Sequence, residues 1–531
     1  KGLPGLKARA HAIHAQRCCS MWRHSFHGFV GSNPLLLGLP VTVVVSSAVK
    51  RRCKCPPRPL HCAEALPSSL EVGPFVAASA EGRWHDVLNK VVGTLCDPGS
   101  APFDSGIAFV GASLLNDADG IADVASELST RLRVCVLTAC VVNGVLGTDP
   151  SRGSVTSGLP LWKRVLNRLV GRSLLSHRTP REISHNACLS VCLFRHAHAT
   201  PVVLGKADGS NEAMEEAQHR GRVTAAILFA DGISPAATAS MRLSAAFPGA
   251  TQVGVVGAQL LDSDGVRVPS LAVVGGAADG WPAGPCGSVR LWAGGAVGLL
   301  LEGPRIHSVL CSGVRGVGPW LPITGVKDGI VTALDRERVG EALHGAFQSL
   351  SCEEQLLVRH RAFFGLRRQG GDDASETWVL QRLGKRTASG GYAVAMAEPG
   401  MDLRLHVSDR GTAEAELQLL PQLYALESSL EGSSAGAGAV SGCLILSDRL
   451  RTKDFFQREA ADAEAALRTP SLGEAPVCGC LGRGQLAAPG VTLHGSRKDA
   501  AVHTGSAVFA LMCWPEAVEK DNGHVEVRSP G

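Results

Sequence analysis

Residues 223–258, VTAAILFADGISPAATASMRLSAAFPGATQVGVVGA, are the stretch from which the fold can be deduced. The apolar run Ala225–Phe229 is short and ends in turn-forming residues, which is typical of a buried β-strand. Ser234-Pro235 predicts the N-cap and first residue of a helix, and Pro248-Gly249 predicts its end. A second apolar run, Val253–Val256, follows. The stretch therefore predicts a β-α-β unit, in which a right-handed crossover joins two parallel strands.

The same pattern occurs twice more in the chain. The first copy predicts a strand, a helix and a strand at Ile107–Val110, 118–132 and Val134–Leu137. The last copy predicts the same order at Cys443–Ser447, 453–467 and Val477–Cys480. The spacing between the copies is irregular, so the pattern does not indicate a solenoid. We interpret the chain as a mixed α/β protein with duplicated β-α-β cores, long excursions between them, and both parallel and antiparallel strands.

The length of 531 residues favours two domains after a leader. The patterns predict a leader over residues 1–80, with Leu66–Ala80 as a linker, an N-terminal domain over 81–330, a C-terminal domain over 331–514 and a polar tail over 515–531. No apolar run reaches the roughly 18 residues that a membrane-spanning helix needs. The sequence therefore predicts no transmembrane span.

The first 63 residues have the composition of a targeting sequence. They contain ten Lys and Arg and no Asp or Glu, so the net charge of +4 arises there and the rest of the chain is net acidic. Pro34–Val49 resembles the apolar region of a signal peptide and is followed by the basic segment Lys50–Lys54. This order is typical of import into a plastid, with a mitochondrial or cytoplasmic location and a merely disordered extension as alternatives. Because the basic residues are confined to the leader, nothing favours a nucleic-acid partner.

A second basic segment, 150–185, interrupts the N-terminal domain. Its part over Leu161–Leu174 places apolar residues on one face of a helix and most of its basic residues elsewhere. That pattern is typical of a helix that lies on a membrane surface or binds a protein partner, through residues 160–175. A surface insertion with an ordinary packed helix is the alternative.

Further elements are expected between the β-α-β units. Leu271–Gly275, Val289–Trp292 and Ala296–Glu302 predict three successive antiparallel strands. Val309–Thr324, VLCSGVRGVGPWLPIT, predicts a glycine-rich loop. Helices are predicted at Trp84–Leu95, Val339–Leu350 and Cys352–Leu366, and in a segment that Pro421 ends or kinks.

The usual catalytic and metal-binding signatures are missing. The sequence contains no phosphate-binding GxxxxGK[ST], no HExxH and no GxSxG nucleophile elbow, because its match at Gly432–Gly436 falls in the low-complexity linker Glu431–Ala439. His196-x-His198 and Cys478-x-Cys480 could each place two ligands on one strand face, but neither has a partner pair at structural-zinc spacing. We therefore predict no metal and no cofactor.

Two residues lie where an α/β sheet carries its chemistry. Cys140, at the end of a strand, occupies the position of a nucleophile, but no His and acid pair can be assigned to it, so a buried cysteine is the alternative. Asp231, at the carboxyl end of its strand, faces the usual ligand crevice, and its alternative role is to cap the following helix.

Several motifs, taken in order, resemble those of one family. They are Phe229–Pro235 with Val253–Ala258, Ala139-Cys140 with Gly144 and Gly147, Gly313 with Arg315 and Pro319–Thr324, and Gly482–Gly484 with His503-Thr504. Over about residues 106–512 they are similar to the FIST proteins, which carry a sensory domain. The chain departs from the family at Val314 and Gly316, which replace a Cys and a Pro, and at Ala139, Ala258 and Thr504, which replace glycines. No F-box-like pattern occurs in the first 80 residues, so the resemblance is to the plant, algal and bacterial type without an F-box.

The resemblance implies two FIST-type domains, N-terminal and C-terminal, in a non-enzymatic signal-transduction protein. It implies a small metabolite, with an amino acid as the candidate, bound among the glycine-rich loops at the strand ends. The predicted ligand-binding residues are Cys140, Asn143, Gly144, Asp231, Gly313 and Arg315, with Arg315 as either a carboxylate partner or a surface ion pair. Two alternatives remain: an enzyme that uses Cys140 or Cys311 as a nucleophile, and a scaffold that docks through residues 160–175.

Overall fold

The computed structural model describes most of the chain beyond residue 73. The described residues are 74–96, 103–116, 120–148, 180–183, 187–195, 198–204, 212–275, 288–368, 379–384, 386–388, 390–394, 397–430, 440–469, 472, 475–487, 490–492, 495–497 and 500–514. They belong to the compact unit Leu66–Gly531. Most of the predicted leader, the basic helix at 160–175, the polar tail and His196 lie outside the described residues. Among the described helices, none is long and apolar enough to cross a membrane.

The central β-α-β unit is confirmed. Strand β8 (Val223–Ala230), helix α6 (Ile233–Ala246) and strand β9 (Thr251–Val256) follow one another, and β8 pairs in parallel with β9. The predicted helix start is wrong by two residues, because the N-cap is Gly232 and Pro235 lies inside the first turn. Proline is tolerated there, since the first-turn N–H groups have no partner within the helix.

The other two β-α-β units are also confirmed. The first consists of β2 (Ser105–Gly111), α3 (Ile121–Leu132) and β3 (Val136–Val142), and the last of β23 (Val440–Asp448), α11 (Ala461–Arg468) and β24 (Val477–Gly482). Both strand pairs are parallel. The single helix predicted over 453–467 is instead two, because left-handed residues Gln457 and Ala460 separate α10 (Lys453–Phe456) from α11.

Three sheets are built around these units. Sheet A has the order β1-β6-β2-β3-β12-β13, sheet C has β7-β14-β8-β9-β25-β28, and sheet B contains β15-β29-β23-β24-β4-β5, with β26 and β27 beyond β15. The remaining bounds are β1 (Phe75–Glu81), β4 (Gly144–Thr148), β5 (Pro180–Ile183), β6 (Cys188–Phe194), β7 (His198–Leu204), β12 (Leu271–Gly275), β13 (Ser288–Trp292), β14 (Ala296–Glu302), β15 (Arg305–Cys311), β25 (Gly484–Ala487), β26 (Gly490–Thr492), β27 (Gly495–Arg497), β28 (Ala501–His503) and β29 (Ala507–Cys513).

The three sheets share one topology. In each sheet the two middle strands of the six belong to a β-α-β unit and are parallel. Every other pair of neighbouring strands in the six is antiparallel. We call residues 75–194, 198–302 and 305–513 repeats 1, 2 and 3. Repeat 1 supplies the last two strands of sheet B, repeat 2 those of sheet A, and repeat 3 those of sheet C. Each repeat therefore gives two strands to the sheet of another repeat and receives two from the third, so this exchange of strands forms a closed cycle.

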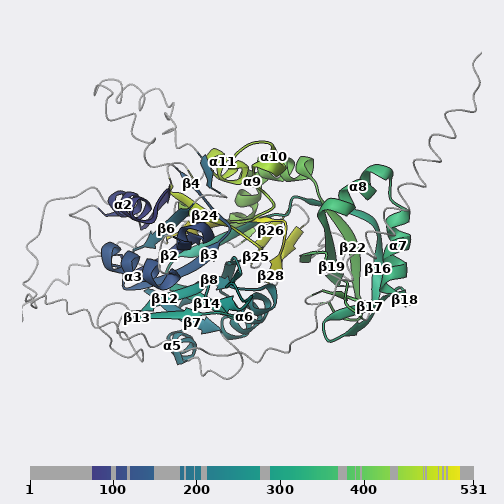
Figure 1. Ribbon diagram of the computed structural model, residues 1–531, viewed down its shortest axis with the longest axis horizontal. Coiled ribbons are helices and arrows are strands. Elements are labelled where there is room, and N and C mark those ends of the chain that lie inside the picture. Colours follow the sequence, from purple (N-terminus) through teal and green to yellow (C-terminus); the bar gives the residue numbers. More distant parts are fainter. Residues whose placement is uncertain are drawn as a thin grey trace, which may run out of the picture. The chain divides into compact units, whose positions relative to one another are not determined.

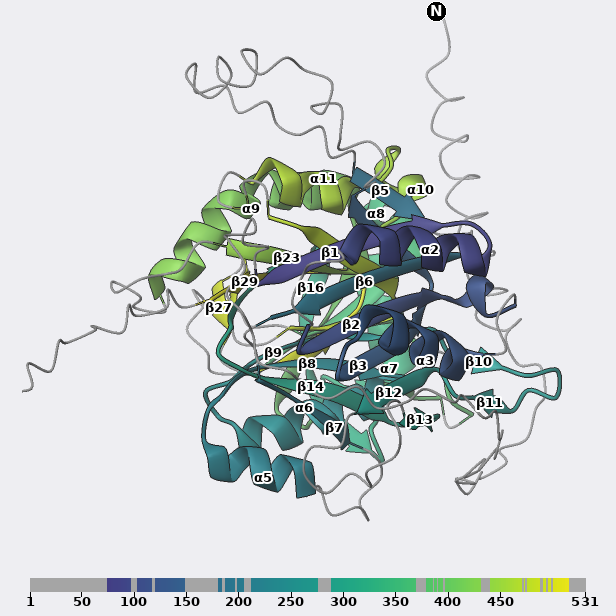
Figure 2. The same ribbon diagram turned by 90° about the vertical axis from the view of Figure 1, so that its left-hand side faces the viewer.

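This exchange creates one core that all three sheets share. Phe109 of sheet A, Phe229 of sheet C and Leu446 of sheet B belong to it, and the rings of Phe109 and Phe229 meet edge to face with centroids 5.8 Å apart. The outer faces are covered by separate helix groups: α2 (Trp84–Leu95) and α3 on sheet A, α5 (Glu212–Arg220) and α6 on sheet C, and α9 (Arg410–Leu430) with α10 and α11 on sheet B. Figures 1 and 2 show these groups on different sides of the strands. Burial on both faces explains why the parallel strands are mainly apolar.

A fourth sheet interrupts repeat 3 between β15 and α9. Its strands are β16 (Val314–Lys327), β17 (Ile330–Leu334), β18 (Glu337–Arg338), β19 (Ala362–Arg368), β20 (Val379–Arg382), β21 (Tyr392–Ala393) and β22 (Met401–Ser408), and Figure 1 shows helices α7 (Val339–Gln348) and α8 (Cys352–Arg361) beside it.

Several sequence-based expectations are wrong in this part of the chain. The loop predicted at Val309–Thr324 is the end of β15 and most of the long strand β16. The helix predicted to Leu366 ends at Arg361, because Phe363, Phe364 and Leu366 pair with β22 in strand β19. Long-range pairing overrides the local pattern in both cases.

Two more expectations are corrected near the N-terminal half. Strands β12 and β13 pair as predicted, but β14 joins β7 and β8 in sheet C, so the three strands do not form one meander. The predicted linker overlaps β1, which pairs with β6 from Phe75 onward. Sheets B and C each combine strands from both sides of residue 330. The division into domains stays a prediction.

Candidate functional site

The three repeats meet where their strands cross from one sheet to the next. Three backbone hydrogen bonds connect them: Asn143 N–H to Leu481 O (2.9 Å), Ala258 N–H to Val141 O (2.7 Å) and Arg483 N–H to Val256 O (2.7 Å). The donor and acceptor residues are equivalent in the three repeats. The bonds connect repeat 1 to repeat 3, repeat 3 to repeat 2 and repeat 2 to repeat 1, and so form a ring. We call residues 141–143, 256–258 and 481–483 the three-strand junction. It lies at the carboxyl ends of parallel strands, where open α/β sheets bind ligands.

The junction is too tight for side chains at some positions. A Cβ atom on Gly257 would lie 2.5 Å from the carbonyl oxygen of Val141 and 2.7 Å from the Sγ atom of Cys140. On Gly482 it would lie 2.8 Å from the carbonyl oxygen of Val256. Gly257, directly after β9, and Gly482, at the end of β24, are therefore required by close approach of backbone.

A cavity of 210 Å³ lies beside the junction, between repeats 2 and 3. It is bounded by the strand ends of β8, β9 and β23 and by residues from the hairpin β10–β11 (Leu260–Leu261 and Arg267–Val268), from β20 and from the segment before β29. Its charged and polar lining residues are Asp231, Gln259, Arg267, Arg382, Asp448, Arg449, Arg483 and Thr504.

Asp231 is a buried carboxylate with one oxygen in use. It is 3% exposed, and its Oδ2 atom accepts a hydrogen bond from Gly294 N–H and lies 3.8 Å from the Nη1 atom of Arg267. Its Oδ1 atom is buried and has no hydrogen-bond partner among the described residues. A buried carboxylate oxygen without a donor is costly, so Asp231 has the capacity to hold a donor from a ligand.

Asp448 occupies the same place in repeat 3, directly after Ser447, which pairs with Ala507 as Ala230 pairs with Ala296. Its Oδ2 atom accepts from Gly505 N–H at 2.8 Å and its Oδ1 atom from Leu450 N–H at 2.9 Å. Burial raises the pKa of the Asp448 carboxyl. Both of its oxygens are therefore engaged, in contrast to those of Asp231.

Four guanidinium groups surround this cavity. Arg267, Arg382, Arg449 and Arg483 reach it from four separate segments, and all four are exposed residues. Burial, together with the charges of the other three arginines, lowers the pKa of Arg483. The Nη1 atom of Arg483 donates to Gln259 Oε1 at 3.0 Å. Thr504, a residue that is 3% exposed, adds a buried hydroxyl that has no hydrogen-bond partner within the described chain.

The structure brings together four of the six predicted ligand-binding residues. Asn143 belongs to the three-strand junction and is half-buried, and Cys140 in β3 and Gly144, the first residue of β4, flank the junction on either side. The charge of Asp231 acts on the thiol of Cys140, so these two side chains are near each other. Of the six predicted ligand-binding residues, only Asp231 lines the cavity.

Gly313 and Arg315 lie elsewhere. Gly313 has φ +62°, its N–H donates to Glu416 Oε2 at 2.7 Å, and a Cβ atom there would collide with Arg451. The Nη1 atom of Arg315 is 3.1 Å from Glu354 Oε1, in a partly exposed ion pair. Neither residue lines the cavity beside Asp231.

The two cysteines considered as nucleophiles are both fully buried. Burial raises the pKa of the Cys140 thiol, and the nearby Asp231 raises it further. Burial also raises the pKa of Cys311 well above its ordinary value. Both side chains are therefore thiols at neutral pH, whereas a nucleophilic cysteine needs a thiolate.

Sequence reasoning missed most of the cavity. Asp448, Thr504 and the four arginines were not predicted as ligand-binding residues. A signal was present, because ACVVNG at Ala139–Gly144 and GCLGRG at Gly479–Gly484 occupy equivalent places in repeats 1 and 3. Aligning the repeats would have drawn attention to Arg483, and to Asp448 as the counterpart of Asp231.

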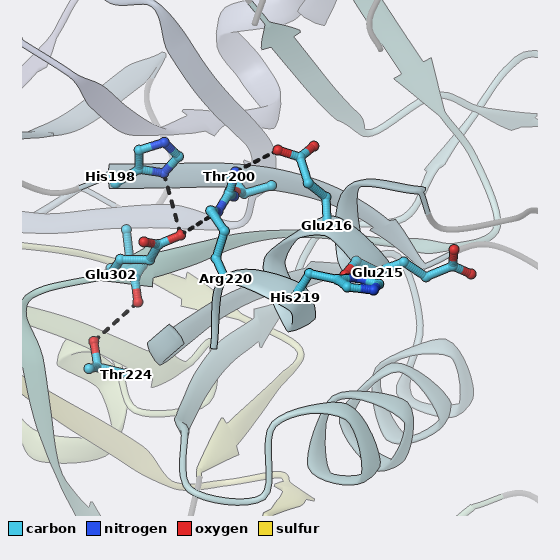
Figure 3. Close-up of polar contacts among 9 residues, drawn as sticks. His198, Thr200, Glu215, Glu216, His219, Arg220, Thr224 and Glu302 are labelled. Carbon is cyan, nitrogen blue, oxygen red and sulfur yellow. Dashed lines mark hydrogen bonds and ion pairs between the residues drawn. The ribbon is translucent and has the colours of Figure 1, made fainter. Parts of the chain in front are cut away.

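A second polar cluster lies in sheet C and contacts α5, at the opposite end of β8 (Figure 3). Glu302 accepts from Arg220 Nε at 2.9 Å and lies 3.6 Å from His198 Nδ1, while Arg220 also contacts Glu216 and Thr200. These contacts fasten α5 to β7 and β14. No group of three or more metal-ligating side chains occurs among the described residues, and His198 is engaged with Glu302.

These features define a mixed α/β protein whose sheets converge on a charged cavity at their strand ends. Residues 104–337 match the FIST N domain, a sensory domain of signal transduction that is associated with small ligands. Uncharacterized proteins of Mycobacterium bovis and Mycobacterium tuberculosis are each 25% identical to this chain over 237 residues. The match covers 43% of this chain and 58% of each relative, which is less than two thirds of their length.

Proposed function

We propose that this protein is a non-enzymatic sensor that binds a small ligand in the cavity between Asp231 and Asp448. The observation that carries the proposal is the Oδ1 atom of Asp231, which is buried without a partner among the described residues while Asp231 lines that cavity. The position agrees with the usual place of ligands in α/β sheets, outside the carboxyl ends of the strands.

The size and lining of the cavity support a small polar metabolite. Its 210 Å³ is below the roughly 300 Å³ of the smallest pockets that hold drug-sized ligands. A carboxylate accepts from an ammonium group, and an arginine binds a carboxylate with a fork of two N–H groups. An amino acid has both groups and is the candidate ligand.

The enzyme alternative has no support in the described site. A reactive cysteine needs a lowered pKa and access to solvent, and Cys140 and Cys311 are buried with raised pKa values.

We also propose a C-terminal FIST-type domain over residues 331–514 and a location in a plastid. The proposed location rests on the acid-free N-terminal composition. Imaging a fusion of residues 1–80 to a fluorescent protein tests the location, and a diffuse cytoplasmic signal would contradict it.

The test of the function is a thermal-shift screen of the full chain against amino acids and other small metabolites. A ligand at about 100 times its dissociation constant stabilises the folded state by about 2.7 kcal/mol. We expect at least one reproducible hit that Asp231→Asn weakens, with Asp264→Asn, an exposed carboxylate on the hairpin tip, as the matched control. A blank screen on folded protein would contradict the proposal and favour the scaffold alternative through residues 160–175.

A further inference from the structure

We infer that the ligand of this cavity carries one cationic group and two separate anionic groups, as an acidic amino acid does. The inference rests on the proposed function and narrows it to a chemical class. It comes from the charges around the cavity and from which of their atoms are already engaged.

The cationic group is required by Asp231. Its Oδ2 atom is occupied by Gly294 N–H and faces Arg267 at 3.8 Å, and its buried Oδ1 atom lacks a donor within the described chain. Asp448 does not offer such an acceptor, because backbone N–H groups hold both of its oxygens. The ligand's ammonium group therefore belongs at Asp231, where the carboxylate and the donor compensate each other.

The two anionic groups follow from the excess of positive charge. Four guanidinium groups face two carboxylates in the cavity. A neutral zwitterion, with one ammonium and one carboxylate, leaves that excess unchanged. A ligand with a second carboxylate reduces it, which favours binding of an acidic ligand over its uncharged amide.

The placement of the arginines favours two separate groups over one compact anion. Arg267 comes from the hairpin β10–β11, Arg382 from β20, Arg449 from the segment after β23 and Arg483 from the turn between β24 and β25. One carboxylate accepts from one or two guanidinium groups. The unpartnered hydroxyl of Thr504 supplies a further donor for an oxyanion.

The experiment measures binding of matched ligands to the full chain by calorimetry. L-glutamate and L-aspartate are compared with L-glutamine and L-asparagine, which have the same shape and one negative charge fewer. They are also compared with glutarate and succinate, which lack the ammonium group, and with inorganic phosphate. We expect at least one acidic amino acid to bind at least tenfold more tightly than both its amide and its dicarboxylate analogue.

Variants assign the two preferences to residues. Asp231→Asn should remove the preference for the amino acid over the dicarboxylate, and Arg483→Gln should reduce the preference for the acid over the amide. Arg222→Gln, at an exposed arginine just before β8 and outside the cavity, is the matched control and should change neither ratio. Urea unfolding of each variant confirms that it is folded.

The outcomes separate this inference from the proposed function. If a neutral amino acid binds as tightly as the acidic one, the chemical class is wrong and the sensor proposal stands. If the dicarboxylate or phosphate binds as tightly, the cationic group is wrong. If a different small metabolite binds at the cavity and no acidic amino acid does, the inference fails alone, and if nothing in either experiment binds, both fail.

Discussion

The backbone N–H of Arg483 donates a hydrogen bond of 2.7 Å to the carbonyl oxygen of Val256. This bond joins the turn after β24, in repeat 3, to the end of β9, in repeat 2. It is one of three equivalent bonds at the three-strand junction, and it is the one beside the cavity. The side chain of Arg483 is thereby held close to Asp231, whose charge only partly opposes the lowering of the arginine's pKa by burial and by the neighbouring arginines.

The junction should not tolerate a side chain at Gly257. We expect Gly257→Ala to lower the free energy of unfolding by about 2–3 kcal/mol, because its Cβ atom would meet the backbone oxygen of Val141 at 2.5 Å. Gly249→Ala, where a Cβ atom would meet nothing within 4 Å, should change it by less than about 0.5 kcal/mol. Urea unfolding monitored by circular dichroism measures both, and equal values for the two variants would contradict the close approach.

The buried ion pair of Arg451 and Asp462 should be strongly coupled. Its N···O distances are 2.8 and 3.1 Å, and the side chains are 1% and 2% exposed. Arg451→Met leaves a buried carboxylate without its cation and should cost about 3–5 kcal/mol, whereas the double variant with Asp462→Leu should recover much of that loss. Arg410→Met, which breaks an exposed pair with Glu414, should cost about 0.5 kcal/mol or less. Additive single effects in the double variant would show that the pair is not coupled.

Stability should fall with rising pH through the titration of Glu416. Burial raises the pKa of its carboxyl above 4.5, although hydrogen bonds from Ser312 and Gly313 oppose the shift. The folded state therefore binds this proton more tightly than the unfolded state, so its contribution to stability is lost as the pH rises from about 4.5 through the folded-state pKa. Glu416→Gln removes this loss, so its stability relative to the unmodified protein should increase over that window.

Urea unfolding at a series of pH values between 4 and 8 measures the effect. Glu414→Gln, at a more exposed carboxylate in the same helix, is the control for removing one negative charge from α9. A Glu416→Gln curve that runs parallel to that of the unmodified protein would mean that the pKa of Glu416 is the same in the folded and unfolded states.

Thiol labelling of the folded protein should distinguish the exposed from the buried cysteines of the part of the chain that the structure describes. Among the described residues, Cys135 and Cys352 are exposed and Cys96 is half-buried, whereas Cys140 and Cys311 are buried. Burial also raises the pKa of Cys188 and Cys443 to about 12. We expect iodoacetamide at pH 7.5 to modify the first three and to spare the buried ones, as mapped by peptide mass spectrometry. All should react in 8 M urea, and rapid native labelling of Cys140 or Cys311 would reopen the enzyme alternative.

The three β-α-β units could be predicted from the amino-acid sequence alone. Each is encoded locally, because an apolar run, a helix start and a stop signal lie within one stretch such as Val223–Val256. The same information located Asp231 at a strand end, and the order of the glycine motifs was enough to suggest the FIST N domain. Asp231 is also the one predicted residue that lines the cavity.

The way in which the three units combine could not be predicted, because it depends on long-range strand pairing. Whether Gly144–Thr148 pairs with β24, or Gly484–Ala487 with β9, depends on strands far away in the chain, and no local pattern specifies such a partner. The same holds for Val314–Lys327, whose glycines suggested a loop and which is a strand because β17 and β22 pair with it. The cavity is formed by this exchange, since its two carboxylates and four arginines lie on segments that only strand pairing brings together.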